Sequence, residues 1–292
     1  MLLQLKALRF LFEAREAIHF PVGKSANILR GAFGTIFRTL ACVPECESAA
    51  TCDIRSTCPY AQMFEPTGPA PSGLSDWPRP FVFRASHLDG TTIPAGGSFH
   101  FDLNLFDLKS PAEKYLALAF AQLAHKGLGP GRSKVELVGV ESNAIRCPLS
   151  FGAGNVTKLS LLFLTPTELK SNSRIADKPE FEVLAARVRD RISALCELYG
   201  DGAPKMDYKA FAERAALVRM TRCEVQQVSV ARRSSRTGQV HSIGGFIGEA
   251  EYEGSLGEFV PWLHAARWTG VGRQTVWGKG VIEVRMLQPS HP

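Results

Sequence analysis

GVGRQTVWGKGVIEVRM, residues 270–286, is the stretch that decides the fold. Four glycines and two basic residues form a loop there, and the loop runs directly into an alternating segment typical of a strand. A similar order occurs earlier, where GLGPGRSKVELVGV covers residues 127–140. Each stretch follows a segment with helical features, at about 111–124 and 256–267. The order of helix, glycine-rich loop and closing strand is therefore present twice.

The segments upstream of these two loops also repeat one order. Apolar residues at helical spacing predict helices over 25–40, with Ser25 as the N-cap, and over 182–199. Strand-like patterns cover 2–14, 81–83, 98–105, 159–166, 219–230 and 245–253. Each half of the chain then forms one βαββαβ unit. We predict an α+β protein of two tandem ferredoxin-like, RRM-like domains, residues 1–151 and 152–292.

The composition allows a large core and a polyanionic partner. The chain has 292 residues, of which 45% are hydrophobic, and its 34 Lys and Arg against 28 Asp and Glu give a formal charge of +6. The first residues alternate between apolar and polar side chains, which is not the pattern of a signal peptide. No segment approaches the ~20 apolar residues that a membrane helix needs. These features predict a cytoplasmic protein.

Several motifs of the chain occur together in one known family. The C-terminal part carries the Ser235-Arg236 pair, the turn GGFIG at 244–248 and the spacing G-x-G-x5-G-x-G at 270–280. Further matches are LRGAFGTIFRTLAC, CPYAQMF, GLGPGRSKV and LFLTPTELK, which begin at residues 29, 58, 127 and 162. In these motifs and their order the chain resembles the sixth Cas family, the endoribonucleases of the RAMP superfamily that process precursor crRNA.

The resemblance implies a metal-independent endoribonuclease that binds CRISPR repeat RNA. In that chemistry a ribose 2′-hydroxyl attacks the adjacent phosphate and leaves a 2′,3′-cyclic phosphate and a 5′-hydroxyl. The alternative is a non-catalytic crRNA-binding subunit of a CRISPR effector complex, with other Cas subunits as partners, because the superfamily also uses this fold without cutting. A remoter alternative is a protein whose metal site is functional and for which RNA is irrelevant.

The catalytic candidates follow from the same resemblance, since the family commonly places a histidine near the first strand-to-helix turn. His19 is the histidine of that region, and Lys24 and Arg30 lie close enough in sequence to stabilise charge on the phosphate. His241, between an arginine-rich run and the GGFIG turn, is the second candidate. A lone histidine is more often structural than catalytic, so both assignments compete with that interpretation.

The candidates for RNA binding are basic residues and the C-terminal glycine loop. Arginine offers a planar set of donors suited to phosphate, and glycines let a backbone approach it closely. A plain helix-to-strand turn and a solvated basic surface are the competing interpretations. The predicted contacts are Arg38, Arg132, Lys134, Arg219, Arg222, Arg232, Arg233, Arg236, Gly270, Gly272, Arg273, Gln274, Gly278, Lys279 and Gly280.

Four of the seven cysteines lie in a long insertion at about 42–80 that has little regular pattern. Cys42, Cys46, Cys52 and Cys58 have the spacing C-x3-C-x5-C-x5-C. Four thiolates can hold a structural Zn²⁺ or, as a less favoured alternative, an iron–sulfur cluster, and unliganded thiols are the third possibility. Such a metal would organise the insertion and would have no open position for catalysis.

Overall fold

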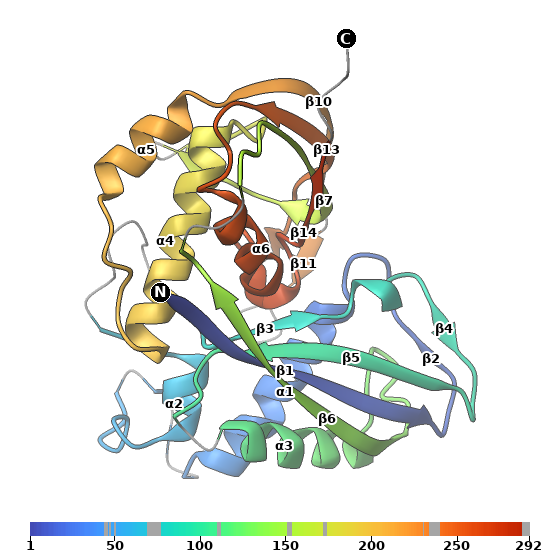
Figure 1. Cartoon of the computed structure of the whole chain (residues 1–292). Helices are drawn as coiled ribbons and strands as arrows, with labels where there is room; N and C mark the ends of the chain where they lie inside the picture. The colour runs from blue at the N-terminus through green and yellow to red at the C-terminus, as the bar shows by residue number, and fades with distance from the viewer. Residues whose placement is uncertain are drawn as a thin grey trace.

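The computed structural model describes residues 1–43, 46, 48–49, 51–68, 77–109, 112–150, 154–171, 174–229, 231–233 and 240–287. Its main elements form two four-stranded antiparallel sheets, each covered by two helices (Figure 1). One sheet is built from residues 2–148 and the other from residues 158–286. The predicted domain boundary near residue 152 lies outside the described residues.

The first unit has the order β1, α1, β3, β5, α3, β6. These elements are Leu2–Ala14, Ser25–Ala41, Phe81–Arg84, Ser98–Leu105, Ala112–Lys126 and Val135–Pro148. Within the sheet the order is β3-β5-β1-β6, so the first strand lies between the third and the fourth of the main strands. This is the βαββαβ arrangement of a ferredoxin-like unit, as the sequence predicts.

The second unit repeats this arrangement with β7, α4, β10, β13, α6 and β14. These elements are Lys158–Thr167, Phe181–Tyr199, Arg219–Val228, Gly245–Glu253, Val260–Thr269 and Ile282–Met286. The sheet order is β10-β13-β7-β14, which is equivalent to that of the first sheet. Two tandem ferredoxin-like units are therefore confirmed.

Shorter elements decorate the two units. The helices are α2 (Pro59–Phe64), α5 (Tyr208–Ala216) and the single turns η1 (Ser86–Leu88) and η2 (Thr275–Trp277). The short strands pair as β2 (Ile18–His19) with β4 (Thr92–Ile93), β8 (Lys170–Ser171) with β9 (Arg174–Ile175), and β11 (Ala231–Arg233) with β12 (Val240–Ser242).

Phenylalanine dominates the core of the first unit. Along β1 and β5 every second side chain points toward the helices, which buries Phe10 and Phe101 completely. Phe120 of α3 lies against both rings, with centroid distances of 4.5 Å and 5.0 Å. Phe33 of α1 stacks on Phe120 at 5.3 Å and so joins the two helices.

The opposite face of the first sheet is partly buried by the second unit. Leu3 and Leu5 of β1 and Val82 of β3 belong to the core of the second unit, together with Phe106. In Figure 1, α6 and β14 of the second unit lie beside this face of the first sheet. The two units are therefore joined by a continuous apolar contact.

Two local predictions at helix N-termini were wrong, the N-cap of α1 and the first residue of α6. Lys24, not Ser25, is the N-cap of α1, because Ser25 already has helical geometry and its backbone N–H and hydroxyl both donate to Asp89 Oδ1, at 2.9 Å and 2.6 Å. Helix α6 begins at Val260 instead of residue 256, with a proline in its first turn. Among the described residues no helix is both long and apolar enough to span a bilayer.

Replacing Phe120 by alanine should lower the free energy of unfolding by about 3–5 kcal/mol, because it removes a fully buried ring that joins α1, α3 and the sheet. The matched control is Leu118→Ala on the same helix, where the side chain is 50% exposed, and its effect should stay within about 0.5 kcal/mol. Urea unfolding measures both. Equal losses of unfolding free energy for the two variants would contradict the observed orientation of α3, with Phe120 buried and Leu118 exposed.

Candidate functional site

The turn between β2 and α1 carries the first histidine candidate. His19 is exposed on β2, and its Nδ1 lies 2.9 Å from Thr92 Oγ1 on the partner strand β4. The other ring nitrogen, Nε2, has no hydrogen-bond partner among the residues that the structure describes. Gly23 follows with a positive φ of 69°, and half-buried Lys24 then begins the helix. The imidazole is therefore held at one nitrogen and open at the other.

The first glycine-rich loop packs directly on this turn. Its backbone doubles back through two hydrogen bonds between Leu128 and Ser133, at 2.9 Å and 3.0 Å. The Ser133 hydroxyl donates to the Ala17 carbonyl at 2.7 Å. A Cβ on Gly129 would lie 3.3 Å from the Ile18 side chain. The loop thus fixes β2 from one side.

The backbone conformation of the second glycine-rich loop requires glycine at four positions. Gly270, Gly272, Gly278 and Gly280 all have φ between 69° and 76°, where side chains are disfavoured. A Cβ on Gly272 would lie 2.3 Å from the Glu168 carbonyl oxygen, and one on Gly280 would lie 2.0 Å from the Val271 carbonyl oxygen. These glycines are required for the loop to fold against β7 and on itself. Gln274 shares this geometry, with φ of 63°.

The end of this loop crosses to the first unit. The Lys279 ammonium donates to the Gly23 carbonyl at 2.9 Å, and the side chain is only 4% exposed. Burial lowers the pKa of Lys279, and nearby Asp89 opposes that shift. A phosphate contact by Lys279, as the sequence predicts, is not available in this conformation because the ammonium lies inside the protein. Both glycine loops therefore meet the β2–α1 turn.

The Arg30 guanidinium lies beside the same junction. It is centred 4.8 Å from the Phe64 ring and 6.0 Å from the Trp277 ring, and the residue is half-buried. Such cation–π contacts stabilise a fixed orientation of the guanidinium. Arg30 is thus near the turn, as predicted, but is held between an aromatic ring of each unit.

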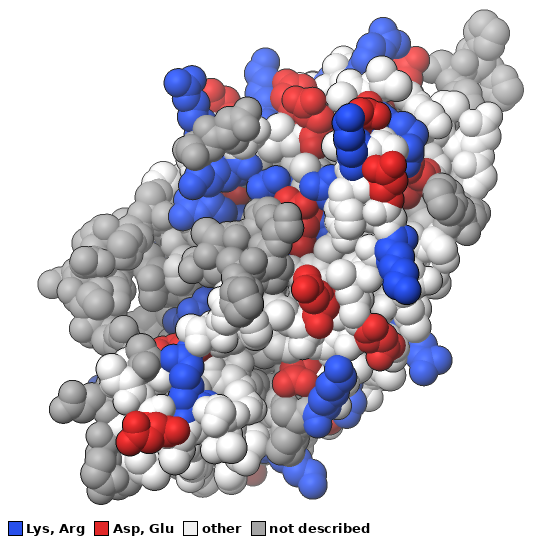
Figure 2. Space-filling view, turned by 90° about the vertical axis from the view of Figure 1, so that its left-hand side faces the viewer, with Lys and Arg blue, Asp and Glu red and all other residues white. Residues whose placement is uncertain are grey.

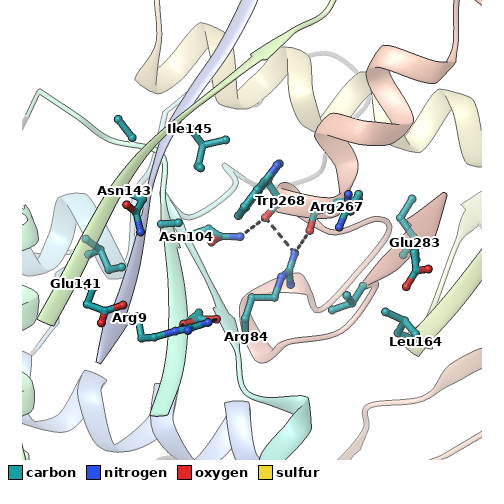
Figure 3. Close-up of a pocket in the computed structure, with 16 residues that line it drawn as sticks. Arg9, Arg84, Asn104, Glu141, Asn143, Ile145, Leu164, Arg267, Trp268 and Glu283 are labelled. Carbon is teal, nitrogen blue, oxygen red and sulfur yellow. Dashed lines mark hydrogen bonds and ion pairs between the residues drawn. The ribbon is translucent and has the colours of Figure 1, made fainter. Parts of the chain in front are cut away.

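The C-terminal end of α6 forms a second junction between the units. Arg84 Nη2 donates to the carbonyls of Arg267 and Trp268, at 3.0 Å each, and Asn104 Nδ2 donates to the latter at 2.8 Å (Figure 3). From the second unit, buried Arg191 donates to the Thr269 carbonyl at 2.9 Å. Helix ends carry partial negative charge on these carbonyls, which favours the guanidinium groups.

Burial perturbs both arginines of this junction: Arg191 is buried and Arg84 is half-buried. Burial lowers the pKa of Arg84 to about 10, and it lowers that of Arg191 to about 9, with a further contribution from the positive charge of Arg84. Arg84 borders a cavity of about 690 Å³ between the two sheets, whose lining also includes Arg9, Asp102 and Trp268. Figure 3 shows Arg84 pointing from β3 toward the end of α6. Sequence patterns gave no signal for this junction.

The remaining basic candidates have different surroundings. Exposed Arg273 pairs with Glu168 at 2.5 Å, and Arg132 is exposed with φ of 51°. The Lys134 ammonium is used at the end of α3, where it donates to the His125 carbonyl at 2.8 Å. Arg38 is half-buried and donates to the Cys46 carbonyl at 2.7 Å. Arg38 and Lys134 therefore have structural contacts, and Arg132 and Arg273 face solvent.

The arginine-rich run on β10 is more balanced in charge than its sequence indicates. Arg222 pairs with Glu224 and Glu251, at 2.7 Å and 3.1 Å, and Arg219 pairs with Glu253 at 3.5 Å. Two of these acids come from β13, the neighbouring strand, which the local sequence could not reveal. On the face of the molecule in Figure 2, basic and acidic side chains are likewise interspersed.

The other predicted residues of this region lie in or beside the β11–β12 hairpin. The backbones of Arg232 and His241 are paired in register, and Arg233 pairs with Val240. The side chains of Arg232, Arg233 and His241, and the whole of Arg236, lie outside what the structure describes. Their predicted roles stay predictions.

The four cysteines of the insertion are free thiols that influence one another electrostatically. Cys42, at the end of α1, is affected by Cys46 and Cys58, and Cys46 is affected by Cys52. Burial, followed by the neighbouring thiols, raises the pKa of Cys42 to about 12. Among the described residues, no three His, Cys, Asp or Glu side chains stand ready to hold a metal ion. Zinc therefore stays a prediction.

Comparison with known proteins identifies the family of this chain. Residues 3–149 match the AF_1859_N family, described as an N-terminal domain. Residues 161–282 match the family of the CRISPR-associated endoribonuclease Cas6. The chain therefore carries a Cas6-family domain in its C-terminal unit. It is accordingly an endoribonuclease that processes precursor CRISPR RNA.

Solved Cas6 structures share the fold over the whole chain. A Cas6 product complex has a TM-score of 0.60 at 18% identity, covering 96% of this chain and 98% of that one. Thermus thermophilus Cas6 has a TM-score of 0.56 at 16% identity, covering 97% and 99%. A partial Cas6-RT-Cas1–Cas2 complex matches with a TM-score of 0.57 at 10% identity, covering 99% of this chain and 47% of that chain. No curated protein matches by sequence.

Two glycine-to-alanine changes should have opposite effects on stability. Gly280→Ala should lower the free energy of unfolding by at least about 2 kcal/mol, since it adds a Cβ at a positive φ and against the Val271 carbonyl. Gly31→Ala, within α1, meets no atom within 4 Å and should raise it by about 0.5–1 kcal/mol. Thermal unfolding measures both. A neutral Gly280→Ala would contradict the observed loop.

Proposed function

We propose that this chain cuts CRISPR repeat RNA at the β2–α1 turn, by attack of a ribose 2′-hydroxyl and without a catalytic metal ion. The observation that supports this site is the meeting of both glycine loops at one turn: Gly129 packs on Ile18, and Lys279 bonds to Gly23. The turn carries an exposed histidine and the start of a helix. The products would be a 2′,3′-cyclic phosphate and a 5′-hydroxyl.

His19 is the proton-transfer group of this proposal. Its Nδ1 contact with Thr92 orients the ring and leaves Nε2 for the RNA. Imidazole is the side chain best suited to exchange a proton near neutral pH. In the reaction the 2′-oxygen forms a bond to phosphorus, the bond to the 5′-oxygen breaks, and protons leave the 2′-hydroxyl and reach the 5′-oxygen. His19 serves one of these two transfers.

Positive charge near the turn would stabilise the phosphate during the reaction. Lys24 is the N-cap of α1 and directly follows Gly23, and Arg273 and Arg132 are exposed on the two glycine loops. Arg30, fixed between Phe64 and Trp277, would act on the phosphate through the electric field of its positive charge. The proposed partner is repeat RNA, and solved complexes of similar fold are described as a Cas6 product complex and a Cas6 substrate mimic complex. Assembly with other Cas subunits, as in the Cas6-RT-Cas1–Cas2 complex, is a further proposal.

Cleavage of the repeat RNA in EDTA tests the chemistry. An all-ribose strand should be cut, and a strand with a single 2′-deoxyribose on the 5′ side of the mapped cut should bind and stay intact. Cutting of the deoxy strand would contradict attack by the 2′-hydroxyl. Loss of cutting in EDTA would contradict a metal-independent reaction.

Single-turnover rates with histidine variants test the site. His19→Ala should slow cleavage by at least about 100-fold with little change in RNA affinity, because general acid–base groups contribute 10²–10⁴-fold. His241→Ala is the matched comparison, and its rate should stay within about threefold of the unchanged protein. The reverse result would move the site to the β11–β12 hairpin.

We also propose a structural Zn²⁺ at Cys42, Cys46, Cys52 and Cys58. Burial and the nearby thiols of Cys46 and Cys58 raise the pKa of Cys42, and thiolates are preferred ligands of Zn²⁺. In the same insertion α2 packs Tyr60, Met63 and Phe64 into the core, and Arg55 donates to the Ala49 and Glu65 carbonyls. A metal would join the four cysteines to this framework.

Metal analysis of the purified protein tests the zinc proposal. We expect about one Zn²⁺ per chain, lost in Cys42→Ser together with a lower Tm, because a structural site contributes directly to folding. Cys223→Ser, at a half-buried cysteine on β10, should keep the metal. Visible absorbance would indicate iron instead, and four reactive thiols with no metal would contradict any metal site.

A further inference from the structure

We infer that Lys279 is a positioning residue for the cut, acting through the Gly23 carbonyl and not through RNA. The inference rests on the proposed cutting site at the β2–α1 turn. It assigns the basic residue at the end of the glycine loop to the junction between the two units. Lys279 thus has a different role from Arg273, the other basic residue of the same loop.

Lys279 enters the first unit from the second. Its Nζ lies 2.9 Å from the Gly23 carbonyl oxygen, and 4% of the residue is exposed. Gly23 directly precedes Lys24, the N-cap of α1. A buried ammonium that lost this acceptor would be strongly unfavourable, so the contact holds the turn tightly.

Asp89 completes the anchoring of the turn. Its Oδ1 accepts hydrogen bonds from the Ser25 backbone N–H and hydroxyl, at the first residue of α1. Its charge also favours the Lys279 ammonium. The start of α1 is thus held by one carboxylate from the first unit and one ammonium from the second.

The neighbours of Lys279 fit closely against the same helix. A Cβ on Gly278 would lie 2.6 Å from Ala26 Cβ, a distance that real Cβ atoms essentially never show. The Phe83 carbonyl oxygen of β3 would lie 3.3 Å from it. Trp277, one residue earlier, faces the Arg30 guanidinium of α1 at 6.0 Å. This part of the loop is a docking surface for α1 and β3.

Arg273 provides the contrast on the same loop. Its side chain is 56% exposed and pairs with Glu168 of its own unit. Phosphate contacts release counterions and give RNA affinity its salt dependence, whereas an internal hydrogen bond does not. Substitutions of Lys279 and Arg273 should therefore change different quantities, the cleavage rate and the salt dependence of RNA affinity.

Lys279→Met removes the ammonium and keeps the length of the side chain. We expect the single-turnover rate at saturating protein to fall at least about 30-fold, while the slope of log Kd against log salt stays unchanged. Arg273→Met should weaken RNA binding and reduce that slope by about one, since it removes one exposed positive charge. A flattened slope for Lys279→Met, or an unchanged rate, would overturn the inference.

A second pair of variants tests the junction without altering charge. Gly278→Ala should slow cleavage because its Cβ meets Ala26 Cβ, in addition to the strain of a positive φ. Ala26→Gly in the same chain should recover the part of that loss caused by the clash, at least about tenfold. Failure of Ala26→Gly to restore any rate would overturn docking of the loop as the cause. Circular dichroism confirms that each variant is folded.

The His19 variant distinguishes an error in the proposed cutting site from an error in the role of Lys279. If His19→Ala cuts at the normal rate, the proposed site is wrong. If His19→Ala is slow and Lys279→Met is fast, the site stands and only the positioning role of Lys279 is wrong.

Discussion

The hydrogen bond from Lys279 to the Gly23 carbonyl is the contact on which the arrangement of this protein most depends. It joins residues 256 positions apart and is buried at the start of α1. At the end of α6, Arg84 and Asn104 of the first unit and Arg191 of the second converge on three consecutive carbonyls. Two similar units are therefore fixed in one orientation by polar donors at helix ends, in addition to their apolar contact.

The glycines of the C-terminal loop have a structural cause that does not require RNA. At Gly272 and Gly280 an added Cβ would meet a carbonyl oxygen, so the loop can form only without side chains there. The loop nevertheless determines the proposed site, because its far end docks on α1 and β3. A glycine motif that is typical of phosphate binding can thus serve an RNA enzyme by joining its two halves, while Arg273 faces outward.

The order of elements could be predicted from sequence because alternation and helical spacing are local properties. β5 and β13 begin and end at the predicted residues, 98–105 and 245–253. Helix α1 begins at the predicted residue, Ser25, but its N-cap was misassigned by one residue because the Ser25 hydroxyl bonds to Asp89, which lies far away in the chain. Lys279 was predicted to contact RNA for a similar reason, since a loop pattern does not reveal that another unit buries the side chain. The partners of the β10 arginines on β13 follow from strand pairing and could not be read locally.

Photo-crosslinking tests the central claim, that RNA is cut at the turn between the two glycine loops. A repeat RNA would carry one photoreactive nucleotide on the 5′ side of the cut and a 2′-deoxyribose that prevents cleavage, and the linked peptides would be identified by mass spectrometry. The account predicts links to residues 15–30 and to the loop at 127–134 or 270–280. Links confined to the hairpin at 231–242, or to β10, would contradict it.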